Sequence, residues 1–175
     1  MTPLQTKQFT FHISSTPIHL HTNLTTIMSP IPSYSRPGRG QHFQEAYGFA
    51  EACIAGDRME IAGQTGMSPT STEVPPTLEE EVAQAFTNVN EVILYTLEKA
   101  KPDLHASVKT GWDRVVKIRT YHVQLPQTRE KIINLMVENV KRWCPDHQPT
   151  WTMLGIEALP FEGQNLEIEV DVFLG

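Results

Sequence analysis

The sequence predicts one α+β domain in which two amphipathic helices cover the same face of a β-sheet. Three observations predict this class. Two segments repeat apolar residues every three or four positions, several others alternate apolar and polar residues, and turn residues separate them. The chain has 175 residues, of which 39% are hydrophobic, which suits a single domain with its own core. The predicted element order is β-β-α-β-α-β-β.

Residues 1–40 are predicted to be an N-terminal extension, mostly loop, and residues 41–175 the folded domain. The first acidic residue is Glu45, so only Lys7, Arg36 and Arg39 carry charge before it, which leaves −9 for the rest of the chain. Prolines and the Arg-Pro-Gly-Arg-Gly stretch at 36–40 oppose regular structure. An acid-free, Ser/Thr-rich segment is also typical of mitochondrial transit peptides, but a single basic residue among the first 35 argues against one.

The domain is expected to open with a β-hairpin and a long helix. Residues 43–54 and 58–65 are interpreted as strands joined by a tight turn at Gly56 and Asp57. The helix should begin at Thr77, because Thr77 and Glu80 form a capping box. Its apolar positions end before Pro102 and give one continuous stripe: Val82, Phe86, Val89, Ile93 and Leu97.

A third strand, a second helix and a final strand pair are predicted to follow. Residues 112–123 alternate, with Val116, Ile118 and Thr120 on the side where His122 is expected to pack against the helices. The second helix opens near Pro126 and ends before Pro145. Its predicted buried face consists of Ile132, Ile133, Met136, Val137 and Val140. Residues 151–159 and 165–173 are expected to form a strand pair across the loop at 160–164.

The last strand has two different faces. Its even-numbered residues from 166 to 172 are all aliphatic and should face the helices, whereas the opposite face carries Glu167, Glu169 and Asp171. This acid face is open to two interpretations. One is that the face simply meets water. The other is that it forms subunit contacts or a ligand cleft, because Trp151 and Met153 are expected to share it.

Composition also limits the classes of function. A net charge of −6 makes a nucleic-acid partner unlikely, because phosphate binding needs a dense basic surface. The two cysteines, Cys53 and Cys144, form no zinc-type spacing and are expected to be reduced. No segment has the apolar length of a membrane span. We expect a cytoplasmic protein without metal or cofactor, with a mitochondrial location as the alternative.

Several short motifs, in a fixed order, resemble the YjgF/Rid family, also known as L-PSP endoribonuclease-like proteins. Together they span about three quarters of the chain. The matching segments are Gly-Asp-Arg at 56–58, Ile-Ala-Gly-Gln-Thr-Gly at 61–66, Gln-Ala-Phe-Thr-Asn-Val at 84–89, Val-Val-Lys at 115–117, Tyr-His-Val at 121–123, Pro-Thr-Trp-Thr at 149–152 and Leu-Glu-Ile-Glu-Val at 166–170. The resemblance implies a chorismate-mutase-like fold and a homotrimer, whose sheets line a central barrel with ligand clefts between subunits.

The resemblance also implies an activity and a set of site residues. Members of the family hydrolyse reactive enamines and imines to a keto acid and ammonia without a cofactor. By position, Glu167 matches the glutamate that handles water and Tyr47 the tyrosine before the first strand. Gly63 and Met153 match the residues that offer a backbone carbonyl and a backbone N–H to the substrate.

Trp151 is where the sequence departs from the family pattern, because it occupies the position of the arginine that binds the substrate carboxylate. An indole has one uncharged N–H and cannot pair with a carboxylate through two bonds. Three interpretations remain open: Trp151 packs structurally, it stacks on a flatter and less anionic substrate, or Arg119 supplies the missing charge from another strand. For Arg119 we favour an ion pair with Glu167 or Glu169.

The sequence therefore supports two functional hypotheses. The first is a cofactor-free enzyme that hydrolyses or tautomerises a small reactive imine, enamine or enol through Glu167. The second is a non-catalytic trimer that binds a metabolite or partner in the same clefts. Endoribonuclease activity is the weakest alternative because of the acidic charge.

Overall fold

The structure is a computed structural model that describes residues 31–175. Within these residues, six strands form one sheet in the order β1-β2-β3-β6-β4-β5. The strands are β1 (Ser33–Tyr34), β2 (Ala52–Ala55), β3 (Arg58–Thr65), β4 (Val115–Val123), β5 (Thr150–Ile156) and β6 (Leu166–Phe173). The helices are α1 (Arg39–Tyr47), α2 (Leu78–Ala100), α3 (Pro102–Ser107) and α4 (Leu125–Trp143), with a 3-10 turn at Gly111–Arg114. The segment whose composition suggested a transit peptide lies largely outside the described residues.

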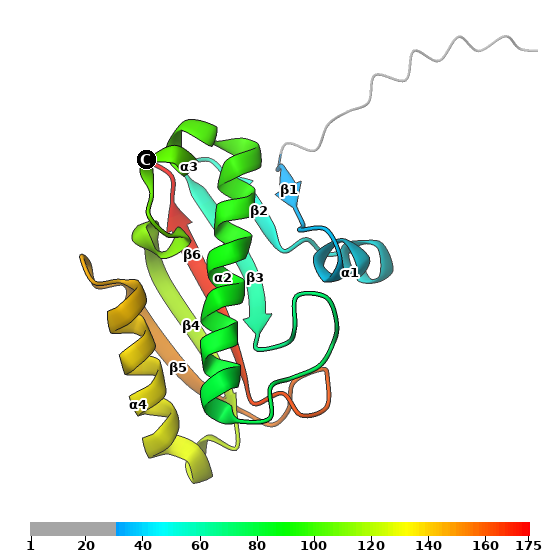
Figure 1. Ribbon diagram of the computed structural model, residues 1–175, viewed down its shortest axis with the longest axis vertical. Helices are drawn as coiled ribbons and strands as arrows, with labels where there is room; N and C mark the ends of the chain where they lie inside the picture. The colour runs from blue at the N-terminus through cyan, green and yellow to red at the C-terminus, as the bar shows by residue number, and fades with distance from the viewer. Residues whose placement is uncertain (1–30) are drawn as a thin grey trace, which may run out of the picture.

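The α+β class and the layer arrangement are confirmed. The two long helices, α2 and α4, lie side by side on one face of the sheet (Figure 1). Beneath them, Leu166, Ile168, Val170 and Val172 of β6 are all fully buried, as the alternation predicted. The predicted stripe of α2 is buried as well, whereas α4 buries Ile132 and Met136 and leaves Ile133 exposed. None of the helices described is long and apolar enough to cross a membrane.

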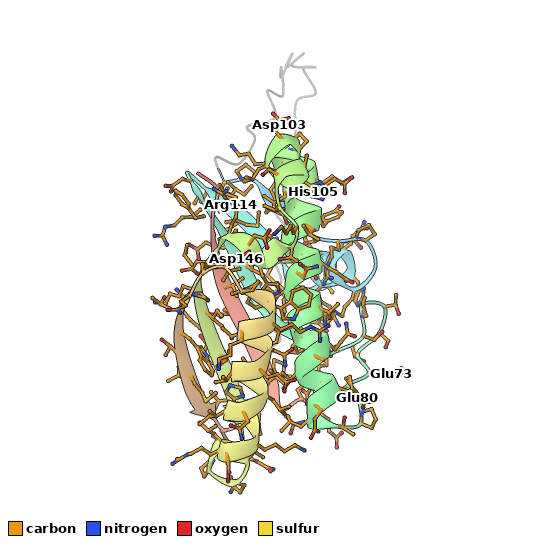
Figure 2. The ribbon with its side chains drawn as sticks, turned by 60° about the vertical axis from the view of Figure 1, so that its left-hand side comes forward. Glu73, Glu80, Asp103, His105, Arg114 and Asp146 are labelled. Atoms are coloured by element: carbon orange, nitrogen blue, oxygen red, sulfur yellow. The ribbon has the colours of Figure 1, made fainter. Side chains whose placement is uncertain are left out.

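The start of α2 follows the predicted capping box. The Thr77 hydroxyl accepts a hydrogen bond from the Glu80 backbone N–H at 3.3 Å and donates one to Glu80 Oε2 at 2.8 Å. Glu79, Glu80 and Glu81 lie in the first turn, where negative charge interacts favourably with the helix dipole. Figure 2 shows Glu80 at this end of α2 and Asp103, in the following helix α3, beyond the other end.

The expected strand at 43–54 is wrong in its first half. The chain forms helix α1 at Arg39–Tyr47, and only Ala52–Ala55 is a strand. Side chains four residues apart support the helix: Gln41 donates to Glu45, and the ring of Phe43 meets that of Tyr47. The predicted turn is confirmed, because Gly56 adopts φ 65° in the two-residue loop between β2 and β3.

Two further expectations about strands are corrected. β4 begins at Val115, after the 3-10 turn, and an irregularity between Val115 and Lys117 leaves Val116 exposed rather than buried. β5 and β6 do not pair with each other. β5 runs parallel to β4 at the sheet edge, and β6 lies antiparallel between β3 and β4. The linker at 157–165 is therefore a crossover past β4, not a hairpin loop.

Candidate active site

A cavity of about 470 Å³ lies where α1 and the loop at 160–164 approach the ends of β3 and β6. Its wall combines four aromatic residues with six charged or polar ones. The aromatic members are Phe43, Tyr47, Phe49 and Phe161, and the charged or polar members are Arg39, Glu51, Gln64, Thr65, Gln164 and Glu167. A concave, mostly apolar cavity with a few convergent polar groups is typical of a small-molecule site.

The aromatic wall is held together by ring contacts centred on Phe43 of α1. Its ring stacks on Phe161 with centroids 5.7 Å apart and an interplanar angle of 3°, and meets the edge of Tyr47 at 5.5 Å. The contact with Phe161 joins the N-terminal helix to the loop that precedes β6. The wall therefore depends on segments from both ends of the domain.

Glu167 of β6 provides a carboxylate that no other side chain neutralises. It lines the cavity, yet within residues 31–175 its side chain forms no hydrogen bond or ion pair. Burial, and secondarily the charge of Glu169, raises the pKa of Glu167 above its usual value. A carboxyl group with a raised pKa can donate a proton as well as accept one near neutral pH.

Gly63 of β3 lies directly against this carboxylate. A Cβ atom built at position 63 would overlap the Glu167 side chain, including its Oε1 atom, so only a glycine permits the approach. The register of β3 and β6 shifts between Ile61 and Gln64, which surrounds Gly63 with irregular pairing. The structure thus brings together Glu167 and Gly63, two of the residues that the sequence singled out.

Tyr47 also lines the cavity, but most of its side chain is exposed, so it lies at the rim.

Arg119 does not line the cavity and lies on the open face of the sheet. It forms two hydrogen bonds to Asp171, at 2.8 and 3.1 Å, and this partner raises the pKa of Arg119. We had favoured an ion pair with Glu167 or Glu169; the partner is Asp171, while Glu169 accepts from Tyr121 at 3.0 Å.

Trp151 and Met153 do not share the acid face, so that expectation is wrong. Trp151 packs against the core on the helix side, where its Nε1 donates to Thr120 Oγ1 at 3.0 Å. Met153 also packs against this core, and a Cβ on Gly155 would contact Leu125 at the start of α4. Neither Trp151 nor Met153 lines the cavity. The alternation in the sequence correctly places Trp151 and Met153 on the same face of β5. Whether that face meets the helices or the acid side depends on how the edge strand β5 pairs with β4.

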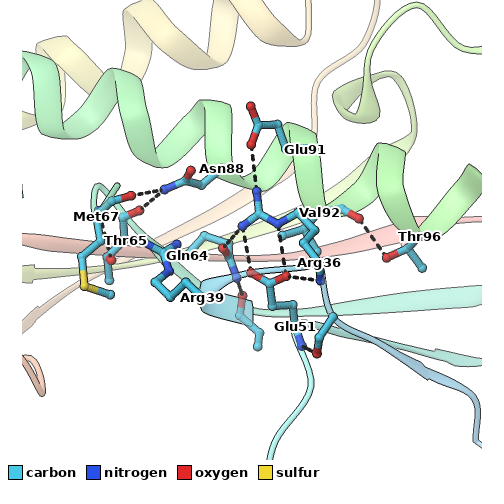
Figure 3. A network of polar contacts seen from close by, with 12 residues as sticks. Arg36, Arg39, Glu51, Gln64, Thr65, Met67, Asn88, Glu91, Val92 and Thr96 are labelled. Carbon is cyan, nitrogen blue, oxygen red and sulfur yellow. Dashed lines mark hydrogen bonds and ion pairs between the residues drawn. The ribbon is translucent and has the colours of Figure 1, made fainter. Parts of the chain in front are cut away.

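Sequence reasoning missed the charged residues on the N-terminal side of the cavity. Arg36 binds both oxygens of the buried Glu51, at 2.8 and 3.1 Å, and also contacts Glu91 at 2.9 Å (Figure 3). Arg39, three residues later, lines the cavity itself. The only available signal was the Arg-Pro-Gly-Arg-Gly stretch, which we interpreted as loop.

Within the part of the chain that the structure describes, no group of three or more His, Cys, Asp or Glu residues is placed to hold a metal ion. His122 is buried on the helix side, as expected, and burial lowers its pKa to about 4. Its Nε2 atom lies 2.9 Å from Thr120 Oγ1, and Nδ1 has no partner among the described residues. His122 is a packed core residue, and it does not line the cavity.

Both the sequence and the fold match a known family. The family model described as "Endoribonuclease L-PSP" matches residues 40–174, so the chain belongs to this family, also called YjgF/YER057c/UK114. No protein of curated function matches the sequence.

Solved structures of low sequence identity share the fold. Yeast Mmf1 is 18% identical with a TM-score of 0.63, and the match covers 83% of this chain and 99% of that one. Rv2704 of Mycobacterium tuberculosis is 20% identical with a TM-score of 0.58, covering 82% and 98%. TdcF of E. coli, solved with bound serine, is 16% identical with a TM-score of 0.57, covering 82% and 93%.

Proposed function

We propose that the protein hydrolyses or tautomerises a small reactive imine, enamine or enol in the cavity described above, with Glu167 as the catalytic group. One observation carries the proposal. Glu167 has an unpaired carboxylate with a raised pKa in a cavity whose exposed wall is mostly apolar. A structural carboxylate would normally be hydrogen-bonded or ion-paired when it is removed from water.

The chemistry asked of Glu167 is modest because an imine is already electrophilic. For hydrolysis, the carboxylate accepts a proton from water as the oxygen attacks the carbon of the C=N bond, and the protonated Glu167 then donates to nitrogen. Loss of ammonia from the resulting carbinolamine leaves the carbonyl compound, so one water is consumed and one ammonia released. Proton transfer between carbon and nitrogen by the same group would give tautomerisation.

We also propose that the protein acts as a homotrimer, with the acid face of the sheet turned inward. The exposed Leu154 of β5 and Phe173 of β6 support a subunit contact on the strands. In such an assembly, the edge strand β5 of a neighbouring protomer closes the cavity. Substrate contacts of Met153 and Arg119 depend on this neighbour, whereas Trp151 keeps its packing role. Tyr47 at the rim is placed to meet a substrate entering between protomers. The serine bound to E. coli TdcF supports small-molecule binding by this fold.

The experiment measures the release of ammonia from enzymatically generated 2-imino acids, with Glu167→Gln as the variant. The expected loss is about 100-fold or more in kcat/KM, the usual contribution of a positioned acid-base group. Glu138→Gln is the matched control, because Glu138 is exposed on α4 and remote from the cavity. A Glu167→Gln variant as active as wild type would refute the catalytic role.

The aromatic wall supports a second candidate, a trimer that binds a metabolite without converting it. Ligand-dependent thermal stabilisation without turnover of any imine or enol would favour this alternative. The family name, "Endoribonuclease L-PSP", also suggests action on RNA, but Arg39 is the only basic side chain among the described residues that line the cavity. Unchanged RNA decay after Glu167→Gln and Arg119→Gln would remove that possibility.

A further inference from the structure

We propose that Arg39 is the residue that binds a carboxylate group of the substrate, and that the substrate class is monocarboxylates with an apolar or aromatic body. This inference deepens the proposed function and rests on the same cavity. It assigns the anion-binding role to the N-terminal helix α1, rather than to Trp151 of β5 or to Arg119 of β4.

Arg39 is a buried cation with most of its hydrogen-bonding capacity unused. It is 8% exposed and lines the cavity, and its only hydrogen bond to the described residues runs from Nη1 to the Ser68 carbonyl oxygen. A guanidinium has five N–H donors in a planar fork that suits a carboxylate. Burial, and secondarily the charge of Arg36, lowers the pKa of Arg39, and the charge of Glu51 offsets this only in part.

Glu51, whose charge acts on Arg39, forms no ion pair with it, because another arginine already binds Glu51. Arg36 donates from its backbone N–H and from Nε to Glu51 Oε2, and from Nη2 to Glu51 Oε1 (Figure 3). No ion pair joins Arg39 to Glu51 or to Glu167 within residues 31–175. Arg39 therefore remains available to an external anion.

The Arg-Pro-Gly-Arg-Gly stretch explains how the two arginines receive different partners. Gly38 adopts φ 86° and ψ −125°, a conformation that a side chain disfavours, and this sharp turn precedes α1. A Cβ atom at Gly40 would overlap the Glu51 carboxylate, so glycine is needed for the close approach. The two glycines thus allow Arg36 to bind Glu51 while Arg39 lines the cavity.

The rest of the cavity defines the ligand class. Arg39 is the single cation among the described lining residues, and Glu167 lies on the same cavity, so a dianion such as a phosphate monoester would be repelled. The rings of Phe43, Phe49 and Phe161 offer an apolar surface to the remainder of the ligand. A monocarboxylate with an apolar or aromatic body can pair its carboxylate with Arg39 and pack its body against the phenylalanine rings.

The test compares ligands that share a body and differ in charge: phenylacetate, phenylacetamide and phenyl phosphate, titrated into the full chain by calorimetry. Wild type is expected to bind phenylacetate about 10-fold or more tightly than phenylacetamide, because hydrogen bonds between charged groups are the stronger ones. Arg39→Gln should remove this preference. Arg129→Gln is the matched control, since Arg129 is exposed on α4, and it should keep the preference.

Four results would overturn the assignment: equal affinity of wild type for acid and amide, no binding of either at about 10 mM, an unchanged preference in Arg39→Gln, or tighter binding of phenyl phosphate. If Arg39→Gln fails to fold, Arg39→Met keeps the apolar stem and must show the same loss. Binding is measured without turnover, so the catalytic proposal fails independently: wild-type kinetics in Glu167→Gln would refute it while the acid preference persists.

Discussion

Arg36 offers a direct comparison of a buried and an exposed ion pair that share one cation. Its guanidinium lies 2.8 Å from Glu51 Oε1 and 2.9 Å from Glu91 Oε2, so the two distances are nearly equal. The side chain of Glu51 is 6% exposed and that of Glu91 is 46% exposed. Glu51 accepts three hydrogen bonds from Arg36 and Glu91 accepts one, so replacing each glutamate by glutamine compares a buried, multiply bonded pair with an exposed, singly bonded one.

The two variants are expected to differ several-fold in cost. Removing one partner of a buried pair leaves an uncompensated charge and typically costs about 3–5 kcal/mol. Arg36 keeps Glu91 in the Glu51→Gln variant, so we expect the lower end, about 3 kcal/mol. Loss of an exposed pair costs about 0.5 kcal/mol, which is the expectation for Glu91→Gln. Glu51→Gln should also disturb the cavity, because Glu51 positions the turn before α1.

Urea unfolding near neutral pH, at one fixed protomer concentration, measures both values. A fixed concentration is needed because any assembly contributes to the free energy of unfolding. If the free energy of unfolding falls equally in both variants, within about 0.5 kcal/mol, the buried pair contributes no more than the exposed one, and the reasoning is refuted. A larger loss for Glu91→Gln would refute it as well.

Three further predictions concern the sheet. Gly63→Ala should lower kcat/KM about 10-fold or more, because the added Cβ displaces Glu167. Thermal stability should change little, because alanine is entropically favoured over glycine by about 0.5–1 kcal/mol. Wild-type kinetics in this variant would contradict the prediction. The folded state raises the pKa of Glu167, so the charged form of Glu167 destabilises the fold as the pH rises from 4.5 through that raised pKa. Glu167→Gln should therefore raise the melting temperature at about pH 7.5 but not at pH 4. A lower melting temperature at both pH values would contradict this. Trp151→Phe loses the bond to Thr120 and should cost about 1 kcal/mol in urea unfolding with unchanged KM; altered KM without loss of stability would instead favour substrate contact.

Features that depend on neighbouring positions in the chain could be predicted from the sequence. The capping box of Thr77, the turn at Gly56 and the buried face of β6 each follow from local spacing, and all three are confirmed. Helix α1 was missed although Phe43 and Tyr47 have helical spacing, because the segment is short and weakly amphipathic. Helix formation there relies on contacts with Phe161, far away in the sequence.

The candidate site was only partly predictable for the same reason. Glu167 and Gly63 were found through family motifs, and the structure places them together. The role of Arg39 was not predicted, because Arg39 is free to bind a ligand only when Arg36 binds Glu51. These two residues are 15 positions apart in the sequence, so no local pattern shows that they pair. The face of Trp151 likewise depends on the parallel pairing of β5 with β4, which alternation alone does not reveal.

The position of β6 between β3 and β4 gives the sheet an unusual order of assembly. Neither β3 nor β4 can complete its pairing until the last strand of the chain inserts between them, so every earlier folding form leaves two unpaired strand edges. The same insertion delivers Glu167 to Gly63. A chain in which β6 has not inserted therefore lacks the proposed catalytic carboxylate at Gly63, and activity in refolding should appear only after β6 has paired with both β3 and β4.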